Sequence, residues 1–288
     1  MSLVTVLGHV VVIVLLLHLL GLGLVRASTG RPFRRDRVQE NVRAVAPTAG
    51  LLGLLLLANG VVRDIGVELS WLIGVNVTKA IHAVEGAFVA DVQSYAVPEL
   101  TAYFSFVYVY GYVFLLTFPL VLYAVFDDSR PLSATLIAYS INYGMGLLLY
   151  VLFVAYGPRN FMPGTVESLL FTNWPEVQHL TARVNENTNV FPSLHTSLSA
   201  TVALLAARYQ SAGPGWLPFA TLGAVSVGMA TMYLGIHWLT DVIAGVLLAI
   251  VSVVVGARVA EKRHGGGETR GGDPRRSLGG GAFEQFRY

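Results

Sequence analysis

The feature that most constrains the fold of this chain is a series of apolar segments, each close to the length that crosses a bilayer. A transmembrane helix needs about 20 predominantly apolar residues. About seven segments approach this length: roughly 3–25, 47–66, 100–126, 131–157, 196–212, 216–236 and 239–257. We therefore predict an all-α fold, a polytopic membrane helical bundle of about seven transmembrane helices.

Composition supports a membrane protein and excludes several kinds of site. The 288 residues are 54% hydrophobic and only 12% charged, with a mean hydropathy of +0.62. A soluble domain carries about twice this charged fraction. The chain has no cysteine, which excludes disulfides, cysteine-ligated zinc and thiol nucleophiles.

Basic residues cluster in two places that predict the orientation of the chain. Arginines gather between residues 26 and 43, and basic residues return between 258 and 276. Because cytoplasmic loops are enriched in Lys and Arg, we expect the N-terminus outside and the tail in the cytoplasm after seven crossings. Neither cluster is interleaved with aromatic residues, which favours topology signals over a nucleic-acid surface.

These signals divide the chain into three parts. Residues 1–46 are predicted to form an N-terminal transmembrane helix and a basic cytoplasmic loop, and 47–258 the main membrane domain. Residues 259–288 form a basic, glycine-rich tail that we expect to be disordered. Between the second and third spans, an apolar stripe predicts one amphipathic helix in the interface. The stripe consists of Val77, Ile81, Val84, Phe88 and Val92.

The polar run NVFPSLHTS, residues 189–197, stands just before the fifth span. Pro192 suits the first turn of a helix, and Ser193 is expected just inside it. Free backbone amides at such a helix start can receive an anion. His195 would project from this first turn.

A second polar run, GIHWLTD, occupies residues 235–241 before the seventh span. His237 and Asp241 are four residues apart, so on a helix they share one face. A carboxylate can then hold one imidazole nitrogen and leave the other free as a nucleophile or base. Arg159, at the end of the fourth span, adds a positive fork suited to phosphate.

The number of spans between these motifs places them on one side of the membrane. The fourth span ends near Arg159, while the fifth and seventh begin near His195 and His237, so all three share one face. With the basic loops inside, this face is extracytoplasmic. Such a group predicts a pocket for a phosphate monoester, diester or pyrophosphate, in which one histidine attacks phosphorus and the other protonates the leaving oxygen.

FPSLHTS, followed about forty residues later by YLGIHWLTDVIAG, resembles the second and third motifs of the type 2 phosphatidic acid phosphatase superfamily. The resemblance covers about 130–257. It implies a six-helix phosphatase-like core behind an extra N-terminal helix, and no metal or other cofactor. It also implies that His237 is the nucleophile, Asp241 its orienting partner, His195 the general acid and Ser193 a phosphate ligand.

Several positions depart from the family pattern. Leu152 stands where the first motif has a lysine, and Asn160 replaces the proline after Arg159. Ala230 and Thr231 occupy the serine and arginine positions ahead of the third-motif histidine. Two phosphate-binding cations of the phosphatases are therefore missing.

These departures are more similar to the branch that includes inositol phosphorylceramide synthases, which also shares the PSLH form. In that branch the phosphoryl group passes to an alcohol of a lipid or polyol, such as inositol. Arg183, in the loop before the fifth span, is the candidate replacement cation; a solvated loop residue is the alternative.

The leading prediction is an integral membrane phosphatase or phosphotransferase whose partners are the lipid bilayer, a lipid phosphate and an alcohol acceptor. Three alternatives stay open. A lipid transporter would use the polar residues along a pathway, and a zinc-dependent hydrolase would use His195, His237 and Asp241 as ligands. In a purely structural interpretation the two histidines satisfy helix ends, Arg159 anchors to headgroups and Ser193 only starts a helix.

Overall fold

The computed structural model describes residues 3–30, 35–175, 190–210 and 213–268, and helices form most of them. Long helices occupy all seven predicted spans. They are α1 (Leu3–Thr29), α2 (Arg35–Ile73), α5 to α6 (Pro98–Phe106 to Tyr112–Ala124), α7 (Arg130–Leu152), α11 (Leu194–Tyr209), α12 (Trp216–Tyr233) and α13 (Leu239–Glu268). The predicted all-α membrane fold is confirmed.

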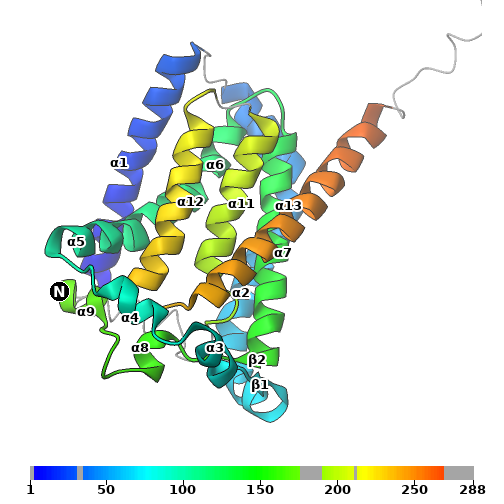
Figure 1. Cartoon of the computed structure of the whole chain (residues 1–288). Coiled ribbons are helices and arrows are strands. Elements are labelled where there is room, and N and C mark those ends of the chain that lie inside the picture. The colour runs from blue at the N-terminus through cyan, green and yellow to red at the C-terminus, as the bar shows by residue number, and fades with distance from the viewer. Residues whose placement is uncertain (1–2, 31–34, 176–189, 211–212, 269–288) are drawn as a thin grey trace, which may run out of the picture.

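Five helical stretches of the described residues are long and apolar enough to cross a membrane by themselves. They are Val4–Thr29, Asp36–Ala58, Pro98–Ala124, Arg130–Leu152 and Leu239–Arg263. The other two, α11 and α12, are shorter and contain more small polar residues. Helix α11 packs against α6, α7, α12 and α13, and Figure 1 shows it inside the bundle. Its polar side chains can therefore be buried against protein instead of lipid.

Asn142 joins α7 to α11 in the interior. It is fully buried, and its Nδ2 donates to Thr201 Oγ1 at 3.0 Å. The hydroxyl of Ser197 donates to the Asn142 carbonyl oxygen. Because buried polar groups need partners, these bonds fix the relative position of the two helices. They also hold the start of α11, which carries a site motif.

Two predicted segment ends are wrong. Helix α2 begins at Arg35, so much of the basic segment predicted as a loop is helical. Asn41 stabilises this extension, since its Nδ2 donates to the carbonyl oxygens of Ala124 and Phe126 at 3.0 and 2.7 Å. Helix α13 continues to Glu268, ten residues into the tail predicted to be disordered. Ala260 packs in a buried cluster there, and Glu261 pairs with a residue of α11.

The predicted interfacial helix is two short helices, α3 (Thr78–Glu85) and α4 (Phe88–Gln93). Gly86 separates them with φ of +58°, a conformation that favours glycine. The break changes the buried face, so that Val84 is 83% exposed while Val89 is fully buried. The continuous apolar stripe therefore does not survive in the structure.

Short elements gather at one end of the bundle and build the surroundings of the site. Helix α7, which occupies the fourth predicted span, ends at Leu152. The chain then forms β2 (Phe153–Val154), which pairs in parallel with β1 (Val75–Asn76). Helices α8 (Pro158–Phe161) and α9 (Leu169–Asn173) follow. Figure 1 shows α3, α4, α8 and α9 at the end where α1 begins, opposite the end of α13.

Candidate active site

His195 lies in the first turn of α11, which begins at Leu194 and not at Pro192 as the sequence pattern predicts. Ser193 is the N-cap residue, outside the helix. Its hydroxyl oxygen accepts from the Thr196 backbone N–H at 3.3 Å and lies 3.0 Å from Thr196 Oγ1. Ser193 is fully buried, so in this structure its hydroxyl serves the helix cap.

His237 lies in a tight turn between α12 and α13. The backbone N–H groups of Ile236 and His237 both donate to the carbonyl oxygen of Thr231, at 2.9 and 3.0 Å. Gly235 makes this turn with φ of +71°, and an added Cβ would lie 2.9 Å from the carbonyl oxygen of Glu167. Glycine is therefore required both by the backbone conformation and by the close approach of the neighbouring chain.

Asp241 holds His237 from the first turn of α13. Its Oδ2 accepts from the Trp238 backbone N–H at 2.9 Å and lies 3.4 Å from Nδ1 of His237. A side chain that reaches back to the N-cap amide is half of a capping box, which fixes the carboxylate. The fixed carboxylate holds Nδ1 of His237, so Nε2 points away from Asp241.

The structure brings His195 and His237 together. Their ring centroids lie 6.2 Å apart, with 56° between the ring planes. Close packing of α11 and α13 explains this, because the Ser193 backbone N–H donates to the Asp241 carbonyl oxygen at 3.0 Å. At Gly245, an added Cβ would lie only 2.5 Å from the carbonyl oxygen of Ser193.

Two tyrosines surround His195, and sequence reasoning missed this role. Tyr108 stacks on the imidazole at 4.8 Å between ring centroids, and Tyr112 lies at 4.5 Å. Tyr108 lies in η1 (Val107–Gly111) and Tyr112 directly follows it; η1 is a π-helical turn, of the kind often found at functional sites. Their spacing of four residues was the available signal, since it places both rings on one helix face.

Arg159 lies on α8, next to the turn that carries His237. Its backbone N–H donates to the Gly235 carbonyl oxygen at 3.0 Å, which ties α8 to the turn that carries His237. Its Cζ lies 4.6 Å from the ring centroid of Phe171. Nη1 is buried and has no hydrogen-bond partner in the part of the chain described. Burial lowers the pKa of this guanidinium. A half-buried cation whose buried Nη1 is unpaired among the described residues is suited to bind an anion.

Burial also sets the protonation state of His237, whose side chain is almost fully buried. Desolvation lowers the pKa of His237 to about 3, opposed by a hydrogen bond with the backbone of Val190 and assisted by the positive charge of Arg159. The imidazole is therefore neutral near neutral pH. A neutral imidazole has the free electron pair that a nucleophile needs.

Glu85 is a second residue that sequence reasoning missed. From α3, its Oε2 accepts from the Leu239 backbone N–H at 2.9 Å and its Oε1 from that of Thr240 at 2.5 Å. These amides belong to the first turn of α13, where a carboxylate is favourable. Glu85 and Asp241 therefore fix the same turn from two sides. Nothing local in the sequence indicates a contact across 154 residues.

Four predicted positions remain, and one of them, Arg183, lies outside the described residues. Leu152 is at the end of α7 and 37% exposed, while Ala230 and Thr231 are fully buried in α12. In residues 3–30, 35–175, 190–210 and 213–268, no three His, Cys, Asp or Glu side chains are grouped as metal ligands.

The fold and the site define a class: an integral membrane protein of helical-bundle architecture whose paired histidines, one held by a carboxylate, lie beside a half-buried arginine. The chain belongs to the PAP2 superfamily, whose family model matches residues 79–255, more than half of the chain. No curated protein and no solved structure matches. Membership supports a lipid phosphatase-type function on a membrane lipid. The matched range also includes α3, and with it Glu85.

Proposed function

We propose that this protein cleaves a phosphate ester, diester or pyrophosphate of a membrane lipid by transient transfer of the phosphoryl group to His237. One observation carries the proposal: the ring centroids of His195 and His237 lie 6.2 Å apart, with Asp241 against the second ring. Two imidazoles held this close can act on the same phosphate group, one as nucleophile and the other as acid. Positioning and charge stabilisation supply most of the catalysis in such transfers.

In the first step, Nε2 of neutral His237 attacks phosphorus in line with the leaving group. A P–N bond forms and the P–O bond to the leaving alcohol breaks. His195, held as an imidazolium by the negative charge of the bound phosphate, donates its proton to the leaving oxygen and becomes neutral. Asp241 stabilises the positive charge that develops on the His237 ring through Nδ1.

In the second step, an acceptor hydroxyl attacks the phosphorus of the phosphorylated His237. The acceptor proton passes to His195, the P–O bond forms and the P–N bond breaks. Both side chains then regain their starting protonation states. Arg159 balances the charge of the phosphoryl oxygens in both steps through its unpartnered Nη1.

We infer that the acceptor is an alcohol of a lipid or polyol, such as inositol, in preference to water. The missing cations at Leu152 and Thr231 support this inference. With fewer cations, the site holds an inorganic phosphate dianion less strongly than a diester, which carries one negative charge fewer. Arg183 remains our candidate for a second phosphate-binding cation.

We place this chemistry on the extracytoplasmic face. The start of α1 lies at the site end of the bundle, and the basic end of α13 lies at the opposite end (Figure 1). With the basic end in the cytoplasm, the histidine pair faces outward.

The test is turnover of labelled lipid phosphates by purified protein, with and without inositol and other alcohols. We expect His237→Gln and His195→Gln each to lower the rate by more than about a hundredfold. His18→Gln is the matched control, because this histidine lies on α1 against Phe114 and Phe118. Free phosphate as the only product would indicate hydrolysis, and a new phosphodiester lipid would indicate transfer.

Wild-type rates in the His237 variant would contradict the mechanism. Loss of wild-type activity with a chelator would favour the zinc hydrolase instead. Lipid movement between leaflets that persists in both histidine variants, without turnover, would favour a transporter.

A further inference from the structure

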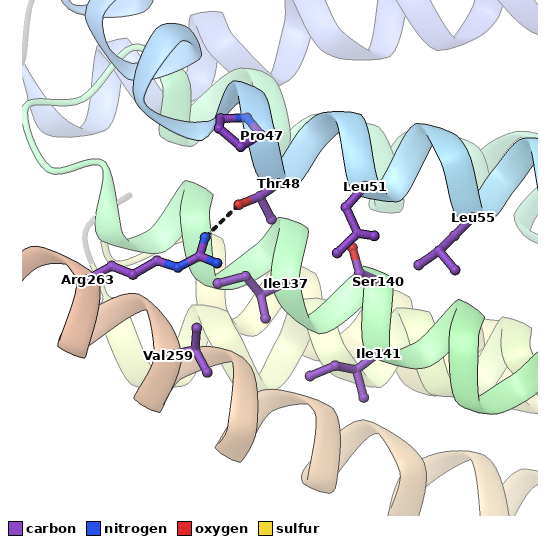
Figure 2. Close-up of a pocket in the computed structure, with 9 residues that line it drawn as sticks. All are labelled: Pro47, Thr48, Leu51, Leu55, Ile137, Ser140, Ile141, Val259 and Arg263. Atoms are coloured by element: carbon purple, nitrogen blue, oxygen red, sulfur yellow. Dashed lines mark hydrogen bonds between the residues drawn. The ribbon is translucent and has the colours of Figure 1, made fainter.

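A cavity of about 270 Å³ lies between α2, α7 and α13, where it is lined by α2 before Ala58 and by α13 near Arg263, away from the histidine pair. Leu51 and Leu55 line it from α2, Ile137 and Ile141 from α7, and Val259 from α13, as Figure 2 shows. Each helix contributes side chains one turn apart, so the cavity follows the direction of the helices. The cavity is therefore elongated, and its walls are mainly apolar.

Packing explains why the cavity is present. Helices α2 and α13 both pack against α7, which forms the floor between them. At Gly256, an added Cβ would lie 3.0 Å from the carbonyl oxygen of Ala134, so α13 rests directly on the backbone of α7. Val259, one turn further on, then reaches the side of the floor that faces α2 (Figure 2).

One end of the cavity is polar and positively charged. Arg263 Nη1 donates to Thr48 Oγ1 at 3.0 Å, and Figure 2 shows both side chains at this end. The nearest acid on the helix, Glu261, pairs with Arg208 at 2.5 Å. None of the carboxylates that the structure describes pairs with Arg263. The guanidinium therefore offers further donors to an anion.

We propose that this cavity binds an anionic membrane phospholipid, with an acyl chain along Leu51, Leu55 and Ile141 and the phosphate on Arg263. Charge and shape together specify this occupant. The volume is just below the range of drug-sized pockets, about 300–1,000 Å³, and matches a section of a chain better than a bulky ligand. Arg263 is the last residue of the apolar span of α13, which is the level of lipid headgroups.

The preference for an anionic headgroup follows from the surroundings of Arg263. Arg258 and Lys262 are exposed on the same helix, so the local field is positive. Basic residues next to a span attract anionic lipids by about 1 kcal/mol each. A zwitterionic headgroup brings its own cation to this field and gains less.

The experiment measures lipid retained by delipidated protein in native mass spectrometry, with dioleoyl phosphatidylglycerol or dioleoyl phosphatidylcholine added at equal concentration. We expect the wild type to prefer the anionic lipid roughly tenfold, and Arg263→Gln to lose this preference. Arg258→Gln is the matched control, because it removes the same charge from the same helix outside the cavity. Leu51→Trp fills the cavity and lowers binding of the anionic lipid while the charge remains.

An unchanged preference in Arg263→Gln, or equal binding of the two lipids by the wild type, would overturn the proposal. Full binding by Leu51→Trp would also overturn it, because the acyl chain would then lie elsewhere. The proposal does not depend on the enzymatic function, since the measurement on the wild type and the three variants is bound lipid and not turnover.

Discussion

Glu85 offers a test of how a residue outside the motifs positions the histidine pair. Its carboxylate receives two backbone N–H groups at the start of α13, at 2.9 and 2.5 Å. Hydrogen bonds to a charged group contribute about 1.5–3 kcal/mol each, and water recovers part of this at a half-buried site. We take about 2 kcal/mol as the net loss in Glu85→Ala. If the turn that holds His237 is displaced and the transition state loses this free energy, kcat/KM decreases about 30-fold.

The assay is kcat/KM on the lipid phosphate that the substrate panel identifies. Glu85→Gln keeps a carbonyl oxygen for one amide and should recover part of the loss. Glu99→Ala is the matched control, since Glu99 is an exposed acid in the first turn of α5, a helix that carries no site residue. Wild-type kcat/KM in a folded Glu85→Ala variant would refute the reasoning, as would an equal loss in Glu99→Ala.

Three further perturbations test the packing, charge and orientation of the site. Gly245→Ala should lower Tm by about 5 °C in a thermal melt, because its Cβ meets a backbone oxygen of α11 at 2.5 Å. Gly144→Ala, with nothing within 4 Å of its added Cβ, should not lower Tm. Arg159→Gln removes a charge that lowers the pKa of His237, so this pKa should rise from about 3. Less of the neutral nucleophile then remains near these pKa values, so the ratio of variant to wild-type kcat/KM should fall as the pH decreases from about 5 to about 3. A constant ratio would contradict this coupling. Asp241→Ala should lower kcat by about a hundredfold or more with little change in KM, measured in the same assay; a change in KM alone would argue against an orienting role.

The seven spans were predictable because a bilayer requires long apolar segments, and the signal is strong in five of them. The sequence did not predict those helix boundaries that depend on contacts between distant elements. The break at Gly86 is an example, since an apolar stripe continues through it and only tertiary packing selects Val89 in place of Val84. The helical start of α2 is another example, because Asn41 bonds to Ala124 and Phe126, at and just after the end of α6.

The candidate site shows the same division. His195 and His237 could be expected on one side of the membrane because the number of spans between them fixes it. Their separation of 6.2 Å could not, since it depends on how closely α11 approaches α13 at Gly245. The contact from Glu85 is likewise set by packing, and no local pattern indicates it. The N-cap position of Ser193 is different, because serine is a preferred N-cap residue and its contact with Thr196 is local.

The stereochemical course at phosphorus tests the central claim most directly. The measurement uses a lipid phosphate whose phosphorus is made chiral with oxygen isotopes, and follows its transfer to the acceptor. Each in-line displacement inverts phosphorus, so transfer through His237 requires two inversions and gives net retention. Net inversion would mean that the acceptor attacks the lipid phosphate directly, and would contradict the account.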